Sequence, residues 1–68
     1  MKNKVVRLRK ALNLSQEDLG DLVDVSRQTI NSLEKEKYNP SITLAFKLAK
    51  VFNCSIEDIF IYEEDDNE

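Results

Sequence analysis

The segment from Gln16 to Leu33, QEDLGDLVDVSRQTINSL, constrains the fold most, because two helical patterns lie only three residues apart. Apolar residues recur at helical spacing on both sides of residues 24–26, with Leu19, Leu22 and Val23 before this break and Ile30 and Leu33 after it. A break this short does not suit a hairpin of long helices. It predicts two short helices joined by a tight turn, with Ser26 opening the second.

The second of these helices carries a polar outer face. With about 100° of rotation per residue and Ile30 turned toward the core, Leu33 falls beside Ile30. The opposite side is then formed by Gln28, Asn31, Ser32 and Lys35, with Arg27 near its edge, and none of these residues is acidic. Amide side chains can bond adenine in two places, and Arg or Lys can do so with guanine. The pattern indicates a helix-turn-helix whose second helix reads base edges through Arg27, Gln28, Asn31 and Ser32, although an ordinary solvated face has the same composition.

The strings LSQEDLGDLVDV and SRQTINSLEKEKYNPS resemble the helix-turn-helix family of phage repressors and Cro proteins, over about residues 4 to 60. The chain is most similar to small stand-alone bacterial regulators of the cytolysin-repressor kind, which share SRQTIN, KYNPS and a final EDIF. Gly20 stands where Ala is commoner in the family, and Asp24 stands where the turn usually has Gly. Since Asp tolerates a positive φ better than most residues, we expect the turn to survive. The resemblance implies a compact, all-α bundle of five helices that binds double-stranded DNA.

Length and composition set the other limits. A chain of 68 residues makes one domain with a marginal core, which pairing with a second copy would help. With one cysteine, Cys54, and no His, neither a disulfide nor a Cys/His zinc site can form within the chain, so we expect Cys54 to be a buried small side chain and expect no metal, cofactor or small-molecule ligand. No apolar stretch approaches the roughly 20 residues of a membrane span. We therefore expect a soluble cytoplasmic protein.

The charge is unevenly distributed. The net charge of −3 hides a cluster of five acidic residues at the end of the chain: Glu63, Glu64, Asp65, Asp66 and Glu68. Residues 1–62 hold ten Lys and Arg against eight Asp and Glu, a net charge of +2. We interpret residues 1–62 as the helix-turn-helix DNA-binding domain and 63–68 as an acidic tail. The tail is either a disordered solubilising end or a competitor of DNA for the basic face.

The other helices have local signals. Val5, Leu8 and Leu12 mark the first helix, and the residues from Leu44 to Phe52 mark an amphipathic fourth helix that Asn53 ends in the left-handed conformation. Capping boxes are predicted at Ser15 with Asp18 and at Ser55 with Asp58. The last opens a short fifth helix in which Ile56, Ile59 and Phe60 close the core.

The apolar run from Ile59 to Tyr62 follows this fifth helix directly. If the helix continues, Ile61 points away from the core, so the run predicts either a short C-terminal strand or an interface. The similar cytolysin-type regulators pair near this end, which places Ile61 and Tyr62 in a homodimer interface. A lone exposed Ile is the alternative.

Arg9 and Glu34 each lie just beside the apolar stripe of their own helix, and partial burial would force them to pair. The resemblance implies that they join the first and third helices and hold the recognition helix at its docking angle. Two independent surface charges are the alternative.

Contacts to the DNA backbone are expected from helix ends and from the loop after the third helix. These positions are Gln16, Ser26, Lys35, Lys37, Tyr38 and Asn39. The family has a phosphate-binding Gln at the position of Gln16, whereas a neutral first-turn residue is the alternative. Lys37 and Tyr38 could equally be ordinary loop residues.

These patterns favour a homodimeric, sequence-specific DNA-binding regulator, with repression as the family's expectation. The alternative is an antitoxin or another protein-interaction module whose DNA binding only autoregulates. We do not expect an enzyme, because there is no His and Cys54 has no base to activate it.

Overall fold

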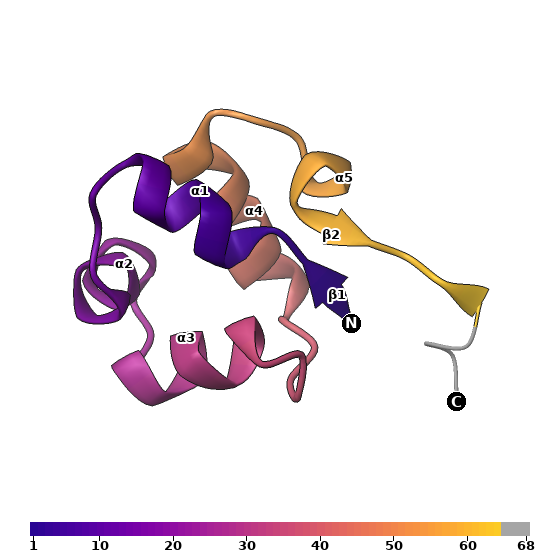
Figure 1. Cartoon of the computed structure of the whole chain (residues 1–68), viewed down its shortest axis with the longest axis horizontal. Coiled ribbons are helices and arrows are strands. Elements are labelled where there is room, and N and C mark those ends of the chain that lie inside the picture. Colours follow the sequence, from indigo (N-terminus) through magenta and orange to yellow (C-terminus); the bar gives the residue numbers. More distant parts are fainter. Residues whose placement is uncertain (65–68) are drawn as a thin grey trace.

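Five helices follow one another along the described chain, and a short ribbon pairs residues 2–3 with residues 60–61 (Figure 1). The computed structural model describes residues 1–64. Along this part the elements are β1 (Lys2–Asn3), α1 (Val5–Ala11), α2 (Gln16–Val23), α3 (Arg27–Glu34), α4 (Ile42–Phe52), α5 (Ile56–Ile59) and β2 (Phe60–Ile61). The predicted five-helix fold with a short C-terminal strand is confirmed. Positions 65–68 of the predicted acidic tail lie outside the described residues.

Serine side chains begin four of the helices. The hydroxyl oxygens of Ser15, Ser26, Ser41 and Ser55 each accept a hydrogen bond from the backbone N–H three residues later. At Ser15 and Ser55 the third residue, Asp18 or Asp58, also accepts from the serine N–H, so both predicted capping boxes are present. These backbone hydrogen bonds lower the pKa of each Asp below its ordinary value of 3.8. Caps matter here because helices of 4 to 11 residues have marginal stability on their own.

Two predicted left-handed residues end their helices as expected. Asp24 has a φ of 62° after α2, and Asn53 has a φ of 54° after α4. Asn13 and Glu36 also have positive φ, at 59° and 63°, which the sequence patterns did not indicate. Asn is common in this conformation, whereas Glu is rarer there, so the turn at Glu36 carries some backbone strain.

Gly20 has a steric role that explains its departure from the family's Ala. A Cβ on Gly20 would lie 2.6 Å from the carbonyl oxygen of Val25, which is closer than side-chain carbons approach a backbone oxygen. That turn also bonds back to the helix, since the Val25 N–H donates to the Gly20 carbonyl at 3.0 Å. The absent side chain therefore allows the turn before α3 to lie directly against α2.

The buried core draws on every helix and on β2. Its members are Val5, Leu19, Val23, Ile30, Leu33, Leu44, Ala45, Leu48, Ile59 and Phe60.

Two apolar residues expected on helix faces lie outside this core. Leu12 was predicted to lie on the apolar face of the first helix, but α1 ends at Ala11 and Leu12 is 49% exposed. Leu22 is exposed as well, because the buried side of α2 is formed by Leu19, Gly20 and Val23. Cys54 is half-buried against the core, and burial raises the pKa of its thiol.

The terminal ribbon pairs β1 with β2 in antiparallel register, with Lys2 opposite Ile61 and Asn3 opposite Phe60. Helix α5 stops at Ile59 and does not continue through Ile61, because the Ile59 carbonyl accepts the Lys4 N–H at 2.8 Å and the chain extends from Phe60 onward. Alternation along β2 buries Phe60 and leaves Ile61 41% exposed. None of the helices in the described part is both long and apolar enough to span a membrane.

Candidate nucleic-acid interface

Helices α2 and α3, of eight residues each, are joined by residues 24–26. The left-handed Asp24 reverses the chain, and its carboxylate accepts from the Lys47 ammonium of α4 at 3.0 Å. Ser26 then starts α3 by accepting from the Thr29 N–H at 3.2 Å, and its hydroxyl also lies 3.1 Å from that of Thr29. The turn, the cap and the close approach at Gly20 together fix the direction in which α3 leaves α2.

The outer face of α3 has graded accessibility. Ile30 and Leu33 are fully buried beneath it. Arg27, Gln28 and Lys35 are exposed, whereas Asn31 and Ser32 are half-buried. The predicted base-reading set therefore shares one side of α3, with its N-terminal members more accessible than the two residues in the middle of the helix.

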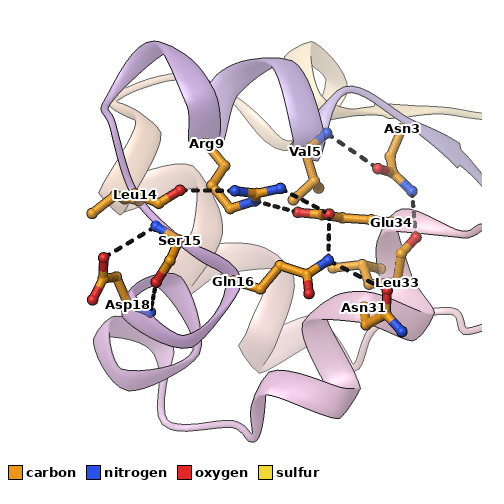
Figure 2. Close-up of polar contacts among 10 residues, drawn as sticks. All are labelled: Asn3, Val5, Arg9, Leu14, Ser15, Gln16, Asp18, Asn31, Leu33 and Glu34. Atoms are coloured by element: carbon orange, nitrogen blue, oxygen red, sulfur yellow. Dashed lines mark hydrogen bonds and ion pairs between the residues drawn. The ribbon is translucent and has the colours of Figure 1, made fainter.

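Arg9 and Glu34 lie together between α1 and α3 (Figure 2). Arg9 Nε donates to Glu34 Oε2 at 2.6 Å, and Arg9 Nη2 donates to Glu34 Oε1 at 3.2 Å, so the pair is bidentate. The two side chains are only 12% and 5% exposed. The remaining guanidinium nitrogen, Nη1, donates to the Leu14 carbonyl at 2.8 Å. This one side chain therefore ties α1, the loop before α2 and the end of α3 together.

Gln16 joins the same cluster, which the sequence patterns did not indicate. Its Nε2 donates to Glu34 Oε1 at 2.9 Å and to Asn31 Oδ1 at 3.3 Å (Figure 2). The expected contact of Gln16 with DNA phosphate therefore cannot use its side-chain N–H groups while these bonds hold, and only its backbone N–H at the start of α2 is left for that purpose. The available signal was the placement of Asn31 and Glu34 one turn apart on α3.

Asn3 is a second residue that sequence reasoning missed. Its Nδ2 donates to the Leu33 carbonyl at 2.9 Å and to the Met1 carbonyl at 3.1 Å, and its Oδ1 accepts from the Val5 N–H at 3.1 Å. Asn3 therefore connects the terminal ribbon to the C-terminal turn of α3, and it also bonds the first backbone N–H of α1, at Val5.

The loop after α3 is exposed along most of its length. Lys35, Lys37, Tyr38 and Asn39 are all exposed. The chain turns through the left-handed Glu36, and the Lys37 N–H donates back to the Ser32 carbonyl at 3.0 Å. The Asn39 side chain accepts from the N-terminal amine at 3.4 Å. Of the positions expected to face the DNA backbone, these four and Ser26 are thus accessible, and Gln16 is half-buried.

Comparisons with known proteins agree with this arrangement. A family model described as Helix-turn-helix matches residues 5–59. An uncharacterized HTH-type transcriptional regulator of Methanocaldococcus jannaschii is 59% identical over 66 residues, which cover 97% of this chain and 100% of that protein. The uncharacterized HTH-type transcriptional regulator YgzD of Bacillus subtilis is 49% identical over 65 residues, with 96% and 98% covered.

A solved structure has the same fold. The restriction-modification controller protein C.AhdI from Aeromonas hydrophila superposes with a TM-score of 0.76 at 30% identity, over 84% of this chain and 86% of that one. The resemblance drawn from the sequence strings is therefore confirmed. The chain belongs to the helix-turn-helix family of the Cro and C1 type, and it is a transcriptional regulator with a helix-turn-helix DNA-binding domain.

Proposed function

We propose that the protein is a homodimeric repressor that binds an inverted-repeat operator with α3 in the major groove and thereby blocks a promoter. The outer face of α3 carries the proposal. It offers Arg27, Gln28, Asn31 and Ser32, followed by Lys35 just after the helix, without a single carboxylate, while Ile30, Leu33 and the Arg9–Glu34 pair hold its inner side. A polar face on a rigidly held helix is what major-groove reading requires.

Arg27 and Gln28 are the most accessible base readers in this proposal. Both side chains are exposed in the first turn of α3, and no hydrogen bond within residues 1–64 occupies either of them. In helix-turn-helix complexes the N-terminal residues of the recognition helix reach the base edges. Asn31 and Ser32 lie one turn further along and would read the neighbouring base pair.

Contacts to phosphate would set the register of α3 on the duplex. The exposed cations Lys35 and Lys37 lie beyond its C-terminal end, with Tyr38 and Asn39 beside them, and Ser26 and the backbone N–H of Gln16 lie at the starts of α3 and α2. Glu36 among the two lysines weakens the local positive field. We therefore expect a moderate number of phosphate contacts and a moderate dependence of affinity on salt.

The homodimer would form at the terminal ribbon. Ile61 and Tyr62 are 41% and 59% exposed on neighbouring positions of the chain, and the monomer core is small. Pairing across a twofold axis would cover both side chains and would place two copies of α3 about 34 Å apart, one helical turn of DNA. Repression by occlusion is the mode that the resemblance to phage repressors implies.

Selection of bound sequences from a random DNA pool tests this function directly. The expected result is an inverted repeat with half-sites centred about one helical turn apart. Binding with no sequence preference would contradict the function. An enriched site without internal symmetry would contradict the dimer while leaving sequence-specific binding intact.

A further inference from the structure

We propose that a chain of hydrogen bonds from Arg9 through Glu34 and Gln16 fixes the orientation of the Asn31 amide, so that Asn31 offers DNA hydrogen-bond donors only. On this inference, which rests on the proposed function, Asn31 reads a base edge that presents acceptors, namely guanine O6 and N7 or thymine O4. It does not make the two-point contact with adenine that an unconstrained Asn can make.

The polarity of this chain follows from the chemistry of its members. A guanidinium has only donors, and an ionised carboxylate has only acceptors. Glu34 accepts two hydrogen bonds from Arg9, and its side chain is only 5% exposed. A further polar group beside its Oε1 can therefore bond this oxygen only by donating a hydrogen bond. Gln16 reaches that oxygen at 2.9 Å and must therefore present its NH2 group and not its carbonyl.

The second proton of the Gln16 NH2 group is donated to Asn31 and so determines how the Asn31 amide is oriented. The Gln16 Nε2 lies 3.3 Å from the Asn31 side chain, and because this nitrogen can only donate, the Asn31 oxygen faces it. Figure 2 shows the Asn31 oxygen turned toward Gln16 and its nitrogen turned away. Within residues 1–64 the Asn31 Nδ2 has no hydrogen-bond partner. The free part of the side chain is therefore an NH2 group on the outer face of α3.

This orientation decides which base edge fits. Adenine presents a donor and an acceptor side by side in the major groove, and an Asn must offer both its oxygen and its nitrogen to bond both. Because the Asn31 oxygen is turned toward Gln16 and its nitrogen is turned away, Asn31 presents only its NH2 group to the base and can satisfy only the acceptor. Guanine presents two adjacent acceptors and thymine presents O4, so both suit a donor-only side chain, whereas the amino group of cytosine does not.

Gln28 provides a comparison on the same helix. Its side chain is exposed, and no hydrogen bond within the described residues restrains it. Both ends of the Gln28 amide are free, so adenine remains open to it. Two amide residues on one face of α3 thus have different base preferences because only one of them is held from behind.

The test uses binding to a panel of operators with each of the four bases at every half-site position. Asn31→Ala first identifies the base pair that depends on Asn31. At this pair we expect wild-type protein to prefer guanine or thymine on the contacted strand. In Gln16→Met, which keeps the Arg9–Glu34 pair, we expect adenine to improve relative to guanine or thymine by at least about fivefold, because the Asn31 amide can then turn. The preference at the Gln28-dependent pair should stay the same.

A second variant changes the group that position 31 presents to DNA from a donor to an acceptor, and keeps the hydrogen bond from Gln16. In Asn31→Asp one oxygen still accepts from Gln16 and the other faces DNA, so cytosine should become the preferred base at the same pair. The proposed orientation of Asn31 would be wrong if wild-type protein preferred adenine at this pair. It would also be wrong if both variants kept specific binding with unchanged base preferences. Loss of all sequence preference in wild-type protein would instead contradict the proposed function together with this inference.

Discussion

Helix α3 and the terminal ribbon differ in how much of their surroundings the single chain supplies. In the single chain, α3 is already held by the cap at Ser26, by the buried Ile30 and Leu33, and by the polar cluster around Glu34. The ribbon consists of two residue pairs and ends at the exposed Ile61, which the exposed Tyr62 follows. Holding α3 in place before it meets DNA would lower the entropic cost of binding, whereas a surface that would pair with a second copy has its apolar groups uncovered in the single chain. Asn3 connects the two regions by bonding the Leu33 carbonyl from β1.

Removing either member of the Arg9–Glu34 pair tests whether contacts within the chain hold α3, and we expect it to change stability more than any other substitution proposed here. Arg9→Met and Glu34→Leu should each lower the free energy of unfolding by roughly 3 to 5 kcal/mol, because each leaves a charge in a nearly buried position without its partner. The double variant should recover much of this loss. Urea denaturation at a fixed protein concentration measures all three.

The exposed pair between Lys47 and Asp24 is the matched control, because its side chains are 42% and 76% exposed. Lys47→Met should cost no more than about 1 kcal/mol. Additive losses for Arg9→Met and Glu34→Leu would show that the buried pair does not act as a unit.

The outer face of α3 is tested by Gln28→Ala. This change should weaken binding to the selected operator by about 1 to 3 kcal/mol and relax the preference at one base pair, because it removes a base contact and leaves the phosphate contacts in place. Lys37→Ala should weaken operator and scrambled DNA almost equally. Titrations of both DNAs with both variants make the comparison, and an equal loss on the two DNAs for Gln28→Ala would exclude it as a base reader.

The ribbon is tested by Ile61→Asp, which places a charge in the expected subunit interface. We expect the dissociation constant of the dimer to rise by about tenfold or more, equivalent to at least about 1.4 kcal/mol. Sedimentation at micromolar concentration follows this change. Leu22→Asp, at an exposed Leu of α2 away from the ribbon, serves as the control and should leave the dimer intact. Dimerisation unchanged in Ile61→Asp would locate the interface elsewhere.

The smallest expected effect concerns the caps before α2 and α5. The pKa values of Asp18 and Asp58 are lowered by backbone hydrogen bonds from Ser15 and Ser55 in the folded chain, so both carboxylates stabilise it above their ordinary pKa of 3.8. This contribution should disappear as the pH falls from about 3.8 through the lower pKa values of the folded state. Thermal unfolding between pH 2 and pH 6 should therefore show a shallower acid loss for Asp18→Asn than for wild type, whereas Asp21→Asn on the outside of α2 should keep the full slope. Identical slopes for Asp18→Asn and wild type would argue against the cap.

The regions differ also in how far sequence predicted them. The helix starts at Ser15, Ser26 and Ser55 and the left-handed Asp24 were predictable, because each depends on residues within one turn. The pairing of β2 with Lys2–Asn3 was not, since two-residue strands have no periodicity and their partner lies at the other end of the chain.

At the site, helical rotation placed Arg9 and Glu34 beside the core, and the structure brings them together. The donation of Gln16 to Asn31 was beyond such reasoning, because it depends on how closely α2 crosses α3. The absent side chain of Gly20 contributes to that crossing, because it lets the turn before α3 lie directly against α2. Local patterns therefore identified the exposed α3 face and the Arg9–Glu34 pair behind it, but not the hydrogen bonds that Gln16 makes to Glu34 and Asn31.

Hydroxyl-radical footprinting of wild-type protein on the selected operator shows whether a dimer formed at the ribbon spaces two copies of α3 along the DNA. We expect two protected patches on one face of the duplex, related by the symmetry of the repeat and about one helical turn apart. A single protected half-site at saturating protein would contradict it.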